Sequence, residues 1–368
     1  MQAFHTNQLP DRTVVLEDGR EYLWFSGTDY LGMGHNETFR SYLNQGFDQY
    51  GTHFGSSRNN SLQLPVYAAA EEKLACFSGA PDALTVSSGM WAGQLLMKEI
   101  ENIVNDETLS DGIHYHYAPG VHPALWGNDY RKETGSWNHW VRQTAKMISQ
   151  SLTGSSHVIC TDSVGSPRIE SFEFSLFKNL PADRNIWLIV DDSHGIGITG
   201  ESGNGIYKTV ASLENMKVIV SFSLNKGMGI PAGAILAEKT VIDILKKSPW
   251  FSGASPCAPA YILAFEQLLT NGIYQHAYEE LKENIRYFKN RLIESDLLRS
   301  ISDYPVLGSE HPALFQYLLD HGIMASCFSY PLPTDLPITR LAITARHQKE
   351  DLDRLAEVCM QFKIVSLS

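Results

Sequence analysis

Residues 186–197 read IWLIVDDSHGIG and contain the feature that decides the fold. An uninterrupted apolar run of this length is typical of a strand covered on both faces. The run ends in Asp191, Asp192 and His194. Because open parallel sheets bind ligands at the carboxyl ends of their strands, this end of the strand is a candidate site. The two acids taken alone could also be a turn cap and a surface charge.

Similar apolar runs occur on both sides of this stretch. They are separated by amphipathic segments, of which residues 66–77 and a helix beginning near Met90 are the clearest. Further strands are predicted at 83–86, 157–160, 217–223 and 232–237. Strands that alternate with helices and lack polar alternation predict an α/β fold with a mostly parallel sheet.

The pattern changes after about residue 256. Two long helical stretches lead into a smaller α/β unit, which ends with a strand at 338–344 and a helix at 349–362. The chain therefore divides into an N-terminal segment (1–45), a large domain (46–265) and a small C-terminal domain (266–368).

Composition limits the classes of function. The 368 residues carry 29 basic and 41 acidic side chains, and this net charge of −12 disfavours nucleic acid and anionic lipid as general partners. No apolar run is long enough to span a membrane, and the first residues do not resemble a secretory signal, so a cytoplasmic location is expected. Five cysteines without a CxxC spacing predict neither disulfides nor a zinc site. The expected partner is a small molecule.

Two motifs suggest chemistry that their context does not support. Residues 195–200 read GIGITG and match the GxGxxG of dinucleotide sites, but that fingerprint must open a helix, and ESGNG at 201–205 is typical of a loop. His114, His116 and His122 could suggest a metal, yet no cysteine or acid supplies a third ligand at a suitable spacing. No dinucleotide and no metal are predicted.

The stretch SFSLNKGMG at 221–229 places Lys226 between a strand and two glycines. Such a lysine could hold an aldehyde cofactor covalently, although an exposed turn is the alternative. Before the helix near Met90 stand Ser88 and Gly89, where free N–H groups favour an anion. Here the alternative is that Ser88 only caps the helix.

In this order, these motifs resemble the α-oxoamine synthases, a family of fold-type I enzymes that depend on pyridoxal 5′-phosphate (PLP). The resemblance covers nearly the whole chain, through blocks such as TDYLGMG, YGTHFGSSR, SSGMWAGQ, VDDSHGIGITGESGNG, SFSLNKGMGIPAGAI, SPCAPA and TRLAITARH. It implies a large domain with a mostly parallel, seven-stranded sheet and a smaller C-terminal α/β domain.

The resemblance also implies roles for individual residues. Lys226 matches the lysine that binds the cofactor, and Asp191 the acid that pairs with its pyridine nitrogen. His122 matches the imidazole stacked on the ring, while His194 and Ser166 resemble the contacts of the ring oxygen.

Other residues are implied to bind the cofactor phosphate and the substrate. The phosphate is expected to contact Ser88, Gly89, Met90 and Ser223. Ser255 resembles a hydroxyl that a second subunit donates to the same phosphate, which implies a homodimer. Arg340 matches the arginine that binds the substrate carboxylate through two hydrogen bonds.

Five positions depart from the family pattern. Thr28 replaces an asparagine, Leu62 a glycine, Tyr67 a histidine, Gly93 an asparagine and Asp162 a glutamate. These departures leave the predicted cofactor residues in place and bear mainly on the choice of substrates.

The activity implied is the condensation of an amino acid with an acyl-CoA, with decarboxylation, to an aminoketone. The 8-amino-7-oxononanoate synthase type is favoured because residues 223–235 lack a GG pair found in ketobutyrate ligases. Two alternatives stay open: another PLP reaction such as that of an aminotransferase or lyase, and a non-catalytic binding protein that keeps the fold.

Overall fold

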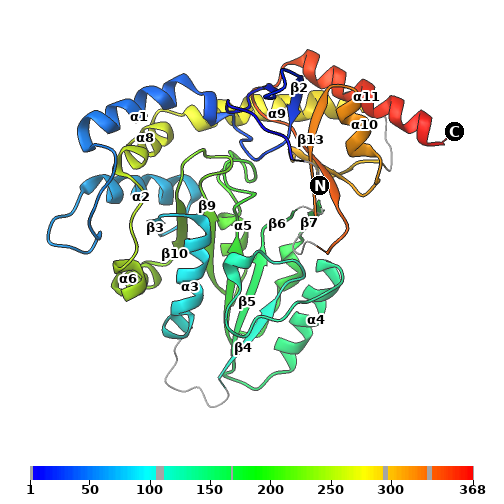
Figure 1. Ribbon diagram of the computed structural model, residues 1–368. Coiled ribbons are helices and arrows are strands. Elements are labelled where there is room, and N and C mark those ends of the chain that lie inside the picture. Colours follow the sequence, from blue (N-terminus) through cyan, green and yellow to red (C-terminus); the bar gives the residue numbers. More distant parts are fainter. Residues whose placement is uncertain (1–2, 105–111, 167–168, 293–296, 330–333, 368) are drawn as a thin grey trace.

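The computed structural model describes residues 3–104, 112–166, 169–292, 297–329 and 334–367. Its larger part is built on a six-stranded sheet (Figure 1). In spatial order the strands are β3 (Asp82–Val86), β10 (Gly233–Ala237), β9 (Lys217–Ser223), β8 (Asn185–Asp191), β5 (Ser156–Asp162) and β4 (Ile113–Tyr117).

Four neighbouring strands of this sheet, β9, β8, β5 and β4, run parallel, whereas β10 is antiparallel to both of its neighbours. The mostly parallel α/β sheet is therefore confirmed, and every strand predicted around residues 186–197 lies in it. In the described part of the chain it has six strands, one fewer than the resemblance implied. The central strands are buried along nearly their whole length, which explains why their sequences show no polar alternation.

Seven helices flank the large sheet among the described residues. They are α2 (Pro65–Ser78), α3 (Gly89–Val104), α4 (Trp137–Gln150), α5 (Tyr207–Ala211), α6 (Lys239–Lys247), α7 (Pro249–Ser252) and α8 (Pro259–Thr270). Of these, α2, α3, α5 and α6 pack directly on its strands. Helix α2 shows why such boundaries can be predicted: Pro65 is its first residue, and Gly79 ends it in the left-handed conformation with φ 73°. The predicted helix at 66–77 and the first of the two long helical stretches predicted after residue 256 are confirmed.

A second six-stranded sheet joins the two ends of the chain. Its strands, in spatial order, are β1 (Thr13–Val15), β2 (Glu21–Phe25), β13 (Ile323–Phe328), β14 (Ile338–Ala342), β12 (Val306–Ser309) and β11 (Arg299–Ser300). Strand β2 pairs in parallel with β13, so that Leu23 lies opposite Ile323. The N-terminal segment thus shares a sheet with the C-terminal region, and the domain boundaries at 45 and 265 stay a prediction.

The remaining elements flank these sheets. Figure 1 shows α9 (Ile273–Arg291), α10 (Leu314–Asp320) and α11 (Lys349–Leu367) beside the second sheet. Helix α1 (Glu37–Tyr50) packs on α8. Short elements complete the list: β6 (Val164–Gly165), β7 (Glu170–Ser171), and the 3-10 turns Met33–His35, Pro123–Leu125 and Phe174–Phe177.

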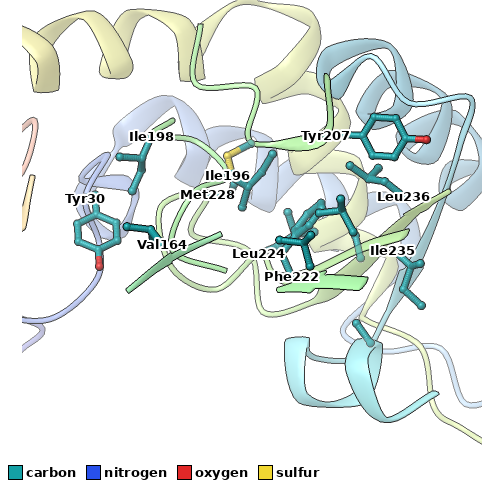
Figure 2. Packing of buried hydrophobic residues seen from close by; sticks show 14 of the residues in the cluster. Tyr30, Val164, Ile196, Ile198, Tyr207, Phe222, Leu224, Met228, Ile235 and Leu236 are labelled. Atoms are coloured by element: carbon teal, nitrogen blue, oxygen red, sulfur yellow. The ribbon is translucent and has the colours of Figure 1, made fainter. Parts of the chain in front are cut away.

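One continuous hydrophobic core joins both parts of the molecule. Figure 2 shows part of it, with Tyr30 at one end and Tyr207 at the other. Tyr30 belongs to the segment after β2 and is fully buried although it carries a polar hydroxyl. A buried hydroxyl needs a hydrogen-bond partner, and the partners of the Tyr30 hydroxyl are side chains of the candidate site.

Candidate active site

A cavity of about 220 Å³ lies at the carboxyl ends of β5 and β8, facing the second sheet. Its walls are formed by Gly27, Thr28, His122, Asp162, Val164, Ser166, Asp191, His194, Lys226, Ser326, Phe328 and Arg340. Six residues predicted from distant parts of the sequence thus meet here: Lys226, Asp191, His194, His122, Ser166 and Arg340. Topology explains the convergence of the first five, because parallel strands bring their carboxyl ends to one edge, whereas Arg340 comes from β14 of the second sheet.

Lys226 lies in the turn after β9 and is largely buried, so the exposed-turn alternative is wrong. Its Nζ atom lies 3.0 Å from Nε2 of His194. Burial lowers the pKa of the Lys226 amine, and Arg340 adds to this effect, while Asp191 and Asp162 oppose it. A lowered pKa favours the neutral amine, which is the nucleophilic and proton-accepting form.

His194 connects this lysine to two further side chains. Its Nδ1 atom lies 3.1 Å from the hydroxyl of Tyr30. The guanidinium of Arg340 donates a hydrogen bond to the same hydroxyl and another, 2.9 Å long, to the carbonyl of Gly27. The Nε atom of Arg340 is buried without a hydrogen-bond partner in the described part of the chain, so this arginine keeps capacity for an anion.

The two consecutive acids after β8 have different environments. Asp191 accepts a 2.9 Å hydrogen bond from the backbone of Ser193, and its second oxygen lies 3.5 Å from Nδ1 of His122, beside the cavity. Asp192 instead accepts from the backbone of Ile206, and burial raises its pKa to about 7. Asp192 therefore holds the following loop, while Asp191 remains available to a ligand.

Asp162, at the end of β5, supports His122 from the other side. It accepts a 3.1 Å hydrogen bond from the backbone N–H of His122. Burial, reinforced by the charge of Asp191, raises the pKa of Asp162 well above its ordinary value. Burial lowers the pKa of His122, and Lys226 adds to this, although Asp191 opposes it. The cavity thus combines a neutral imidazole with a carboxyl group, that of Asp162, whose pKa is raised by burial.

The predicted phosphate residues lie apart from the cavity wall. The Ser88 hydroxyl accepts a 3.1 Å hydrogen bond from the Trp91 N–H, so this serine does cap α3. A Cβ atom on Gly89 would lie 2.5 Å from Cβ of Ser223, which requires glycine where α3 begins against β9. Met90 is 47% exposed, and its phosphate contact stays a prediction.

Ser255 lies exposed in the loop between α7 and α8, outside the cavity wall. The role of Ser255 also stays a prediction.

The two motifs set aside in the sequence have structural explanations. Gly197 and Gly200 both have φ 82° and form a turn that does not open a helix, as expected. His116 lies in β4, where its Nε2 atom is 3.1 Å from Nδ1 of His157 in β5. Within the described ranges, no three histidine, cysteine or acidic side chains are arranged to hold a metal.

The departures from the family pattern fall into two groups. Thr28 and Asp162 line the cavity and therefore bear on ligand choice. The other three lie elsewhere: Leu62 is 69% exposed, Tyr67 donates a 2.6 Å hydrogen bond to the Cys257 carbonyl, and Gly93 packs against Ala124.

A family model described as aminotransferase class I and II matches residues 20–358. The chain belongs to this family. Curated relatives include the 8-amino-7-oxononanoate synthases of Thermosipho melanesiensis (26% identical, 95% of this chain, 90% of the relative) and Citrobacter koseri (29% identical, 94% of this chain, 90% of the relative). The predicted relationship to the α-oxoamine synthases is thereby confirmed.

Solved structures of this family share the fold. Serine palmitoyltransferase of Sphingomonas wittichii superposes with a TM-score of 0.79 at 16% identity, covering 97% of this chain and 90% of its own. A serine palmitoyltransferase solved with PLP gives 0.80 at 15% identity, covering 100% of this chain and 94% of its own. The 8-amino-7-oxononanoate synthase of Francisella tularensis gives 0.67 at 17% identity, with 94% and 99% coverage. These likenesses confirm fold-type I.

Among the helices within the described residues, none combines the length and hydropathy needed to cross a membrane.

Proposed function

We propose that this chain is a PLP-dependent acyltransferase of the 8-amino-7-oxononanoate synthase type. It condenses an amino acid with an acyl-CoA, with loss of carbon dioxide and free coenzyme A, and yields an aminoketone. The observation that carries the proposal is the single cavity in which Lys226, Asp191 and Arg340 meet. The curated relatives of that name, 26–29% identical over almost the whole chain, support it.

The residues of the cavity fit the cofactor. A largely buried amine, Lys226, stands near a carboxylate, Asp191, with the imidazole of His122 beside it. The close contact of Gly89 with Ser223 brings the N-terminus of the 16-residue helix α3 against β9, where its free N–H groups favour a phosphate. When bound, PLP supplies a conjugated ring that takes up the electron pair released at the α-carbon of the substrate.

Each side chain has a separate task in this proposal. Lys226 in its neutral form binds the cofactor aldehyde and later accepts the α-proton at Nζ. Asp191 keeps the pyridine nitrogen protonated, and His122 packs against the ring. His194 and Ser166 contact the ring oxygen. Arg340 binds and orients the amino-acid carboxylate through paired hydrogen bonds.

The remaining elements of the proposal concern the phosphate and the assembly. Ser88, Gly89, Met90 and Ser223 contact the phosphate. Ser255 is supplied by a second copy of the chain, so the protein works as a homodimer. Its location is cytoplasmic.

The experiment uses purified protein loaded with PLP. Alanine, glycine and serine are each combined with short, dicarboxylic and long acyl-CoAs, while free thiol and carbon dioxide are followed. One amino acid should release both products with one acyl class, and Lys226→Ala should release neither. Loaded protein that releases no thiol with any pair would contradict the proposal.

A second candidate is an aminotransferase, which is favoured by the description of the matching family model. It predicts transfer of the amino group to a 2-keto acid in the absence of any thioester. Incubation with amino acid and keto acid pairs, analysed for the new amino acid, distinguishes the two activities.

A further inference from the structure

Four polar side chains form a continuous hydrogen-bonded series across the cavity. Arg340, in β14, donates to the hydroxyl of Tyr30. This hydroxyl lies 3.1 Å from Nδ1 of His194, whose Nε2 atom lies 3.0 Å from Nζ of Lys226. The series joins the residue proposed to bind the substrate carboxylate to the residue proposed to accept the α-proton. Tyr30 is the member to which the proposed function assigns no task.

The direction of each hydrogen bond can be derived, beginning at the arginine. A guanidinium only donates, so Arg340 occupies a lone pair of the Tyr30 oxygen. Tyr30 is 0% exposed, and burial raises the pKa of its phenol, which therefore keeps its proton. Besides Arg340, the Tyr30 hydroxyl faces Nδ1 of His194 and the hydroxyl of Tyr304. The stronger acceptor of these two is the unprotonated imidazole nitrogen, which lies 3.1 Å away. Tyr30 thus donates to His194.

The same reasoning continues from His194 to Lys226. Burial lowers the pKa of His194 well below its ordinary value, and Lys226 and Arg340 add to this, so the ring is neutral and carries one proton. If Nδ1 accepts from Tyr30, that proton lies on Nε2. The Nε2–H group then faces Nζ of Lys226, which must accept it. Only a neutral amine has the lone pair to do so, because an ammonium group has none.

We propose that Tyr30 is a positioning residue that fixes His194 in the Nε2–H tautomer and thereby keeps the free amine of Lys226 neutral. This inference deepens the proposed function and rests on it, since a neutral Lys226 is what that reaction requires. Tyr304 assists by donating a 3.1 Å hydrogen bond to the backbone carbonyl of His194, which fixes the residue but not its tautomer.

The charged groups around the lysine explain why such a device is needed. Asp191 and Asp162 both favour the ammonium form of Lys226, whereas burial and Arg340 oppose it. Without the Tyr30 proton, His194 can carry its own proton on Nδ1. Its Nε2 atom, which faces Lys226, is then unprotonated and can accept a hydrogen bond. An ammonium group at position 226 would then gain a hydrogen bond, and the balance would move toward the charged form.

The first test reads the tautomer directly. ¹⁵N-histidine NMR is recorded on the full-length protein freed of bound cofactor, and His194→Asn identifies the His194 signals by their loss. We expect the Nε2–H tautomer in the unmodified protein and a gain of the Nδ1–H tautomer in Tyr30→Phe. Tyr67→Phe is the matched control, because Tyr67 is also buried and donates to a carbonyl, that of Cys257.

The second test measures the lysine. Competitive acetylation of Lys226 against pH, followed by peptide mass spectrometry, reports the fraction of neutral amine. Tyr30→Phe should slow labelling near neutral pH about tenfold, the usual effect of one buried hydrogen bond. Tyr67→Phe should leave it unchanged.

An Nδ1–H tautomer in the unmodified protein overturns the inference whether or not the variant folds. Unchanged labelling of Lys226 in folded Tyr30→Phe also overturns it. Neither readout requires catalysis, so a failure to release thiol would reject the proposed function while leaving the tautomer result standing.

Discussion

Two pairs of partly or fully buried histidines lie at the same sheet and contact different side chains. The cavity pair, His122 and His194, contacts Asp191 and Lys226 at the carboxyl ends of the strands. The strand pair is His116 and His157; they contact each other, and His157 also bonds two serine hydroxyls.

Burial lowers the pKa values of all four imidazoles. A neutral buried histidine is therefore not in itself a sign of function. What distinguishes the cavity pair is direct contact with an amine and a carboxylate that a ligand can reach. The predictions below test this difference.

The largest effect is expected for Lys226→Ala. Loss of the amine removes both the covalent link to the cofactor and the proton acceptor, so thiol release should fall about 10³-fold or more. Thermal unfolding should change little, since a largely buried amine that lines a cavity is replaced by a small apolar side chain. Thiol release by the Lys226→Ala protein at the level of the unmodified protein would show that this residue has no chemical role in the reaction.

Arg340→Lys should have the next largest effect. The lysine keeps the charge but loses the paired hydrogen bonds, so the KM for the amino acid should rise about 100-fold while the KM for the acyl-CoA stays the same. Steady-state kinetics with each substrate varied in turn would measure this. Equal changes in both KM values would place Arg340 outside the carboxylate site.

The strand pair should govern stability at acid pH. The pKa values of His116 and His157 are about 4 in the folded protein, against 6.5 for an unperturbed imidazole. Because the unfolded chain binds protons first, their contribution is complete above pH 6.5 and is lost as the pH falls toward 4. Urea unfolding should show a loss of roughly 3 kcal/mol from each of these two groups over that range.

A matched variant isolates this contribution. His157→Gln should flatten the acid limb of the stability curve, while thiol release at pH 8 stays at the level of the unmodified protein. If His157→Gln abolished activity, the proposed division between the two pairs would be wrong.

Ser155→Ala should have the smallest effect. Ser155 lies 2.8 Å from Nε2 of His157, but Ser151 lies 3.0 Å from the same atom and can replace it. The free energy of unfolding should therefore fall by only about 1 kcal/mol. Urea titration measures this value, and a loss above 3 kcal/mol would show that the two hydroxyls do not substitute for each other.

The sequence is informative about the cavity because its chemistry lies where apolar strands end. Asp191 and Lys226 each directly follow a recognisable run, so local pattern and chemistry coincide. Arg340 is different, since its role is predicted only through the family resemblance. The structure then places its side chain in the same cavity as Asp191 and Lys226.

Tyr30 and Asp162 show what local patterns do not contain. Tyr30 is one aromatic residue in an irregular segment, and its role depends on a contact with His194, 164 positions away. In the sequence, Asp162 is only a conservative replacement of the family's glutamate. Its hydrogen bond with the His122 backbone is seen only in the structure. Strands β1 and β2 are short, and their partner strand is distant in the chain, so no periodicity predicts their place in the second sheet.

The pairing of Leu23 with Ile323 has a consequence for biosynthesis. Strand β2 leaves the ribosome about 300 residues before β13, the neighbour that completes its hydrogen bonds, and such distant pairings form slowly. The large sheet can assemble during translation, whereas the second sheet must wait for nearly the whole polypeptide. Arg340 reaches its position only when the second sheet has formed. The proposed carboxylate site is therefore the last part of the cavity to form after synthesis.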